Sequence, residues 1–160
     1  MNRRLLIIVL MACLLPLGMQ AQQGTFRFAQ LTDIHLTPNN PNPTEDLLRS
    51  VAQINATDSI DFVLVTGDLT EEGDRTTMEK VKSCLDLLKV PYHVVLGNHE
   101  TKWSDSGCTA FGEIFGGERF EFEHKGFLFL GFNSGPLMRM AYGHVVPHCL
   151  LYTSPSPRDR

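Results

Sequence analysis

Residues 62–68 have the sequence FVLVTGD, in which four apolar side chains and a threonine lead directly into a glycine and an aspartate. An unbroken apolar run of this length is typical of a parallel strand that is buried on both faces. Two other segments are also predicted to be strands that run directly into polar residues: residues 26–31 lead into Thr32-Asp33, and residues 92–96 lead into Gly97-Asn98. We therefore expect three parallel strands, each followed at once by polar residues.

Two helices are predicted between these strands, which makes the order βαβαβ with right-handed crossovers. We expect the first helix to begin at Thr44 as N-cap, and the second to begin with a capping box formed by Thr76 and Glu79. Pro91 should separate the second helix from the next strand. Apolar residues recur at helical spacing in both segments, at Leu47, Leu48, Val51 and Ile54 and then at Met78, Val81, Leu85 and Leu88.

The pattern changes after a stretch that contains glycine, serine and aromatic residues. Residues 119–124 and 127–132 alternate or run apolar on either side of Lys125-Gly126. This arrangement predicts an antiparallel hairpin, which we expect at the edge of the sheet.

Polar groups at the ends of the three strands form the candidate site: Asp33 and His35, then Asp68, then Asn98 and His99. Ligands of open α/β sheets collect beyond the carboxyl ends of the strands, so these groups can converge. Carboxylate, imidazole and amide donors together suit Mn, Fe, Zn or Co, and the lack of cysteine in the set argues against a structural zinc site.

Three blocks, Asp33-Ile34-His35, Gly67-Asp68 and Gly97-Asn98-His99-Glu100, resemble the motifs of the calcineurin-like metallophosphoesterases. Their order and their spacing of about thirty residues fit one βα unit per interval. The resemblance covers roughly residues 26–147. It implies an α/β fold, namely part of a two-sheet sandwich flanked by helices, with the C-terminal half of the family's domain missing.

The resemblance also implies the roles of the site residues. Asp33 and His35 would bind a first metal ion, Asp68 would bridge two ions, Asn98 would bind the second, and His99 would act as general acid or hydrogen-bond donor at the leaving group. Two divalent or trivalent ions about 3.5–4 Å apart activate water for attack on phosphorus. The expected substrate is therefore a phosphate ester, and the expected activity is that of a metal-dependent phosphoric monoester or diester hydrolase.

Each site residue has an alternative interpretation. Asp33 and Asp68 could cap helices or stabilise turns, and His99 could make a structural hydrogen bond. His93, within a strand, is expected to be a packed histidine, and His124 an exposed turn residue. The competing class of protein is a non-catalytic metal- or ligand-binding module on the same fold.

Gly143-His144 with His148 does not match the family's final Gly-His-x-His block, because the spacing is wrong and no strand precedes it. The resemblance places three further metal-binding histidines later in the sequence. We therefore expect the chain by itself to be nearly inactive and, with unpaired strand edges, prone to aggregate.

The two ends have a different character from residues 25–148, the expected metallophosphoesterase domain. Arg3, Arg4 and the apolar run to Leu15 predict a secretory signal over residues 1–21, with no membrane span after cleavage and a periplasmic or extracellular location. Lipoprotein processing at Cys13 is less favoured. Residues Cys149–Asp159 match the translation of a transposase adapter used for sequencing libraries, so residues 149–160 are interpreted as an artefactual tail rather than a natural Ser/Pro-rich linker.

A net charge of −4 and the lack of a basic run give no support for nucleic-acid binding. Export would permit a disulfide between Cys84 and Cys108, but two free thiols are equally compatible with the sequence. The oligomeric state is left open.

Overall fold

The computed structural model describes residues 24–106 and 108–135. Its elements are β1 (Phe28–Leu31), α2 (Asn42–Ala56), β2 (Phe62–Thr66), α3 (Arg75–Leu85), β3 (Tyr92–Val95), the π-helical turn η1 (His99–Trp103), α4 (Thr109–Phe115), β4 (Phe120–His124) and β5 (Phe127–Gly131). The signal segment at residues 1–21 with Cys13, the His144 and His148 segment and the tail at residues 149–160 lie outside the described residues.

Strands β1, β2 and β3 form a parallel sheet with β2 in the centre. Phe28 pairs with Phe62 at one end of the β1–β2 ladder, and Thr66 pairs with Val95 at one end of the β2–β3 ladder. The predicted βαβαβ unit is therefore confirmed. All three strands point their carboxyl ends to the same edge of the sheet.

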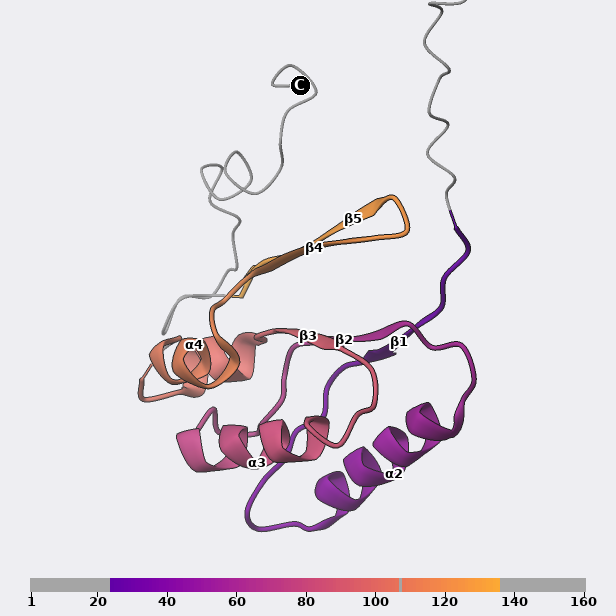
Figure 1. The fold of residues 1–160 in the computed structure, drawn as a ribbon. Coiled ribbons are helices and arrows are strands. Elements are labelled where there is room, and N and C mark those ends of the chain that lie inside the picture. Colours follow the sequence, from indigo (N-terminus) through magenta and orange to yellow (C-terminus); the bar gives the residue numbers. More distant parts are fainter. Residues whose placement is uncertain (1–23, 107, 136–160) are drawn as a thin grey trace, which may run out of the picture.

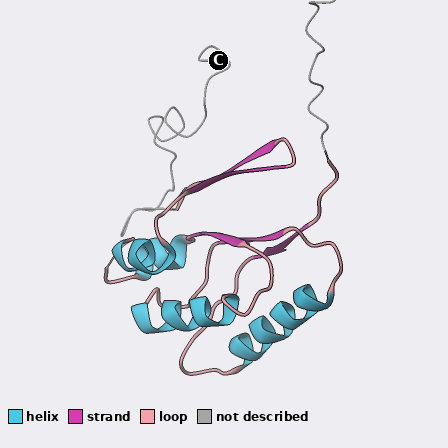
Figure 2. Ribbon diagram, viewed as in Figure 1, coloured by secondary structure: helices cyan, strands magenta, loops and turns pink. Residues whose placement is uncertain are grey.

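Helices α2 and α3 cover one face of this sheet (Figures 1 and 2). Val63 and Val65 of β2 have no exposed surface, and they belong to one core cluster with Val51 of α2 and Met78 and Val81 of α3. Full burial of an aliphatic side chain of this size contributes about 1.5–3 kcal/mol. The core thus fixes the position of β2, and Asp68 of the candidate site follows shortly after this strand.

Both predicted helix caps are wrong. Helix α2 begins at Asn42, two residues before Thr44, because prolines are compatible with the first turn of a helix and Pro43 occupies it here. Helix α3 begins after Asp74, whose carboxylate accepts a 2.9 Å hydrogen bond from the backbone N–H of Thr77. Asp74 therefore takes the capping role that the sequence had indicated for Thr76 with Glu79.

The hairpin of β4 and β5 forms as predicted, but it does not extend the edge of the sheet. It is a separate antiparallel pair that lies over the face opposite the helices (Figure 1). Phe62 of β2 contacts Phe122 and Phe129, with ring centroids 5.1 and 4.9 Å apart. Covering the second apolar face of a parallel sheet buries more surface than adding an edge strand, which accounts for the position of the hairpin.

His93 is a packed histidine, as predicted. Its ring stacks on Phe122 with centroids 3.8 Å apart and an interplanar angle of 9°. Burial between the two sheets lowers the pKa of His93.

His124 is not the exposed turn residue that the sequence indicated. Its Nε2 lies 3.2 Å from Asp61 Oδ1, and its ring makes an edge contact with Phe26. Asp61 also accepts hydrogen bonds from Lys125 Nζ, at 2.7 Å, and from the backbone N–H of Arg27, at 2.9 Å. Lys125 is the main cause of a pKa of about 2 for Asp61, and these contacts tie the hairpin turn to the first sheet.

The sequence showed no signal for α4 or for η1, which occupy the stretch between β3 and β4. Helix α4 buries Ala110 and Phe111 against the core. Cys84 and Cys108 are free thiols, and burial raises the pKa of both, that of Cys108 to about 11. Among the described residues, no helix is both long and apolar enough to cross a membrane.

Candidate metal centre

The site is built on the loops that follow β1 and β2. Parallel pairing continues beyond both strands, because His35 N–H donates to Asp68 O at 3.0 Å and Leu36 N–H donates to Leu69 O at 3.0 Å. Glu71 N–H then donates to Leu36 O at 2.9 Å. The two loops therefore form an extension of the sheet rather than independent turns.

Three site residues have backbones in the left-handed region: Asp33 at φ 53°, His35 at φ 48° and Asp68 at φ 47°. Few non-glycine residues adopt this conformation, although aspartate and histidine do so more often than most. Such conformations cost of order 1–3 kcal/mol and cluster at functional sites. The shared strain at these positions is evidence for a site that is independent of the motifs.

The side chains of these residues converge. His35 Nε2 lies 3.9 Å from Asp33 Oδ1 and 4.0 Å from Asp68 Oδ2, which is too far for a hydrogen bond. Two ligand atoms that bind one ion at about 2.1 Å are separated by about 3.0–4.2 Å, depending on the angle between them. The donor types and their spacing therefore fit a shared metal ion.

The electrostatics of the cluster point to a cation as well. Within the part of the chain that the structure describes, no lysine or arginine forms an ion pair with Asp33 or Asp68. The Asp68 side chain is only 17% exposed. The Asp33 side chain beside it is 61% exposed. For a carboxylate that is partly removed from water, as that of Asp68 is, a neighbouring cation is the usual compensation.

Asp68 is held so that its two oxygens face different neighbours. Oδ1 accepts a 3.1 Å hydrogen bond from the backbone N–H of His99, which leaves Oδ2 on the side of His35. Gly97 lies against Asp68 so closely that an added Cβ would overlap the carboxylate and backbone nitrogen of Asp68. Gly67, at φ 89°, approaches the backbone of Gly97. The two glycines therefore bring the second and third loops into contact, with Asp68 between them.

Glu100, the last residue of the third block, has a structural role that the motif did not reveal. It has no exposed surface, and its carboxylate accepts hydrogen bonds from the backbone N–H groups of Thr70 and Gly97, both at 2.9 Å. The Thr70 hydroxyl donates to the same carboxylate at 3.1 Å and accepts from Gly73 N–H at 2.9 Å. Glu100 thus joins the second loop to the third.

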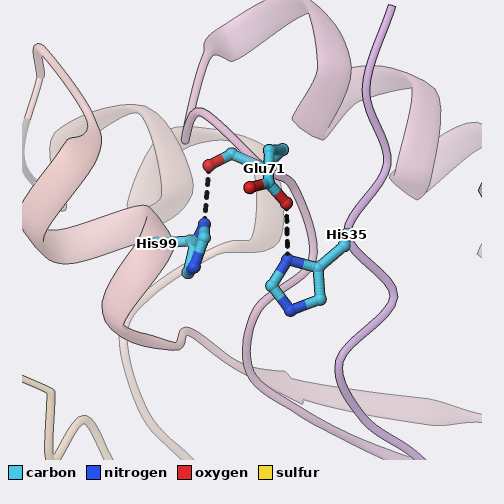
Figure 3. Close-up of side chains that lie close together, drawn as sticks. All are labelled: His35, Glu71 and His99. Atoms are coloured by element: carbon cyan, nitrogen blue, oxygen red, sulfur yellow. Dashed lines mark hydrogen bonds and ion pairs between the residues drawn. The ribbon is translucent and has the colours of Figure 1, made fainter. Parts of the chain in front are cut away.

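Two histidines meet around Glu71 (Figure 3). Glu71 Oε2 lies 2.9 Å from His35 Nδ1, and the Glu71 backbone carbonyl lies 2.6 Å from His99 Nδ1. The two imidazole rings are perpendicular, with centroids 4.6 Å apart. Glu71 was not among the predicted site residues. The signal that could have found it is the acidic pair Glu71-Glu72, three residues after Asp68.

The structure thus brings together Asp33, His35, Asp68 and His99. Asn98 is exposed at the end of β3, and among the described residues its side-chain amide has no hydrogen-bond partner. The assignment of Asn98 to a second ion stays a prediction, as does a bridging role for Asp68. Asp33 also lines a groove of about 250 Å³ between the end of β1 and α2, so this carboxylate is open to solvent.

These ligands, at the carboxyl edge of a parallel sheet, define an α/β protein with a carboxylate–histidine metal-binding cluster. The chain belongs to the calcineurin-like phosphoesterase family, whose model matches residues 26–148.

Several known proteins are similar to the chain. A probable cyclic nucleotide phosphodiesterase of Rhodopseudomonas palustris is 33% identical over 97 residues, which are 57% of this chain and 33% of that protein. Tartrate-resistant acid phosphatase type 5 of Homo sapiens is 29% identical over 120 residues, 68% of this chain and 37% of that protein. The chain spans about a third of the length of these relatives. Among solved structures, a purple acid phosphatase from yellow lupin matches 54% of this chain and 17% of that chain, with 20% identity and a TM-score of 0.36.

Proposed function

We propose that the protein is an exported phosphoric ester hydrolase that uses a dinuclear metal centre, and that hydrolysis belongs to the full-length protein. The convergence of Asp33, His35 and Asp68, all with left-handed backbones and without a lysine or arginine partner in the described residues, carries the proposal. Relatives named as phosphodiesterase and as acid phosphatase support a phosphate ester as substrate. The secretory pattern at residues 1–21 supports export.

The chain's own residues would divide the work between binding and proton transfer. Asp33, His35 and Asp68 would hold the first ion, and Asp68 with the side-chain amide of Asn98, which makes no hydrogen bond within the described residues, would hold the second. When bound, the ions supply a nucleophilic water and Lewis acidity toward the phosphoryl oxygens.

His99 provides the proton for the leaving group in this proposal. Its Nδ1 faces the Glu71 carbonyl, which can only accept a hydrogen bond, so Nδ1 keeps its proton throughout. In the cationic ring, Nε2 therefore carries the proton that passes to the leaving-group oxygen. The ring that remains is neutral and keeps the same hydrogen bond to Glu71.

The test is metal analysis and hydrolysis by the full-length protein, with p-nitrophenyl phosphate and bis(p-nitrophenyl) phosphate as monoester and diester probes. We expect metal-dependent turnover that Asp68→Ala reduces by at least about 10³-fold, because the variant removes a ligand of the cluster. Asp58→Ala, at an exposed aspartate that precedes β2 whereas Asp68 follows it, is the matched control and should retain full activity.

Stoichiometric metal without turnover on either ester would favour the non-catalytic binding module instead. A protein that binds no metal would refute both. To test export, the mature N-terminus of the secreted or periplasmic protein is sequenced, and we expect it to begin near residue 22.

A further inference from the structure

We propose that Glu71 is a positioning residue that sets the ring orientation and tautomer of both histidines of the site, through its carboxylate for His35 and through its backbone carbonyl for His99. The inference rests on the proposed function to the extent that His35 is a metal ligand. It assigns to Glu71 a role outside the set of metal ligands.

The acceptors identify the proton positions. An ionised carboxylate and a backbone carbonyl accept hydrogen bonds and cannot donate them. Nδ1 of His35, 2.9 Å from Glu71 Oε2, and Nδ1 of His99, 2.6 Å from Glu71 O, therefore both carry hydrogen. In each neutral ring the lone pair then lies on Nε2.

This tautomer is the one that the metal cluster needs. His35 Nε2 is the atom that faces Asp33 and Asp68, and in Figure 3 it points away from Glu71. A carboxylate that holds the opposite nitrogen of a ligating histidine fixes the ring and raises its basicity as a ligand. Loss of such a partner typically weakens metal binding by about 10–100-fold. Because the Glu71 side chain is 49% exposed, we expect the lower end of that range.

Glu71 itself is held rigidly by the framework below it. Its backbone N–H donates to Leu36 O, and its neighbour Thr70 is anchored by the buried Glu100. The carbonyl that binds His99 is therefore fixed by backbone contacts that a substitution at Glu71 leaves in place. Only the bond to His35 depends on the side chain.

This asymmetry gives the experiment an internal control. Histidine tautomers are measured by two-bond ¹H–¹⁵N correlation spectra of the metal-free full-length protein at about pH 8, above the ordinary histidine pKa. Zn²⁺ affinity is measured separately by titration calorimetry. The variants are Glu71→Ala, Glu71→Gln and, as matched control, Glu72→Ala. Glu72 is exposed and makes no hydrogen bond or ion pair with the described residues.

We expect the wild type to show hydrogen on Nδ1 of both rings. Glu71→Ala should release His35 into a mixture of tautomers, leave His99 unchanged and weaken Zn²⁺ binding about tenfold. Glu71→Gln offers an amide oxygen as acceptor, so it should restore the His35 tautomer and most of the affinity. Glu72→Ala should match the wild type in both measurements.

The proposal is overturned if His35 keeps hydrogen on Nδ1 in Glu71→Ala, or if Zn²⁺ affinity is unchanged in that variant. Failure of the wild type to bind Zn²⁺ would count against the proposed function instead, and the tautomer result would still decide the role of Glu71. A change at His99 in Glu71→Ala would show that the loop has moved, and it too would overturn the proposal.

Discussion

Replacement of Glu100 by alanine should lower the free energy of unfolding and weaken metal binding at the candidate centre. The carboxylate is fully buried, and its removal leaves the backbone N–H groups of Thr70 and Gly97 without their acceptor. An unsatisfied buried donor costs about 1–3 kcal/mol; the Thr70 donor is buried and the Gly97 donor is partly buried, so the two together cost at most about 6 kcal/mol. We expect a loss of about 4 kcal/mol in the free energy of unfolding.

Glu100→Gln keeps the size of the side chain but removes its charge and one of its two acceptor oxygens, so it separates the effect of the hydrogen bonds from that of lost volume. Its amide oxygen can accept from one of the two N–H groups, but its NH₂ group must face the other, which again lacks an acceptor. The expected loss is about 1–3 kcal/mol, between wild type and alanine.

The assay is urea unfolding of the full-length protein, followed by circular dichroism, together with Zn²⁺ titration of the folded variants. A shift in the midpoint at constant m-value reports stability. Glu72→Ala is the surface control and should stay within about 0.5 kcal/mol of the wild type. A loss below about 1 kcal/mol in Glu100→Ala, with unchanged Zn²⁺ affinity, would refute the view that this carboxylate joins the two loops.

Two further outcomes follow from the structure. Gly97→Ala should reduce Zn²⁺ affinity at least about tenfold, since its Cβ would displace Asp68, whereas Gly112→Ala, with nothing within 4 Å of its Cβ, should bind normally. Asp61 has a pKa of about 2, below its ordinary value of 3.8, so the folded state binds fewer protons than the unfolded chain. Its contribution to stability is present above pH 3.8 and is lost as the pH falls toward about 2. In Lys125→Met, the thermal unfolding temperature should therefore fall less over this pH range than it does in the wild type. Unaltered Zn²⁺ binding in Gly97→Ala, or an equal acid dependence with and without Lys125, would contradict these expectations.

The parallel sheet could be predicted from the sequence because its central strand is an unbroken apolar run and each of the three strands leads into polar residues. Residues 62–66 must be buried on both faces whatever surrounds them, and the structure shows this for Phe62, Val63 and Val65. Alternation likewise identified the hairpin, since Phe120 and Phe122 alternate with exposed glutamates. Alternation shows that one face is buried, but it does not show against which surface, so the hairpin was assigned to the wrong place.

Helix starts were harder to predict because several residues compete for one position. Thr44 and Thr76 are good capping residues, yet α2 already begins at Asn42, with Pro43 in its first turn, and Asp74 caps α3. Local preferences differ by too little to decide between such neighbours, and tertiary packing makes the choice.

Within the candidate site, the convergence of Asp33, His35, Asp68 and His99 followed from strand topology alone. Glu71 and Glu100 were not recognised as members because they neither end a strand nor supply a predicted ligand. Their roles depend on contacts with backbone groups of other loops. A single sequence does not show which loops lie close enough for these contacts.

The extension of the β1–β2 ladder into the two loops has a consequence for how an ion enters. The backbone N–H groups of His35, Leu36 and Glu71 donate hydrogen bonds from one loop to the other. Exchange of these amide hydrogens with solvent therefore requires opening of the extended sheet. The backbone that carries these side chains is therefore ordered before any ion arrives. Binding does not have to order the chain, and its free energy remains available for stripping water from the ion.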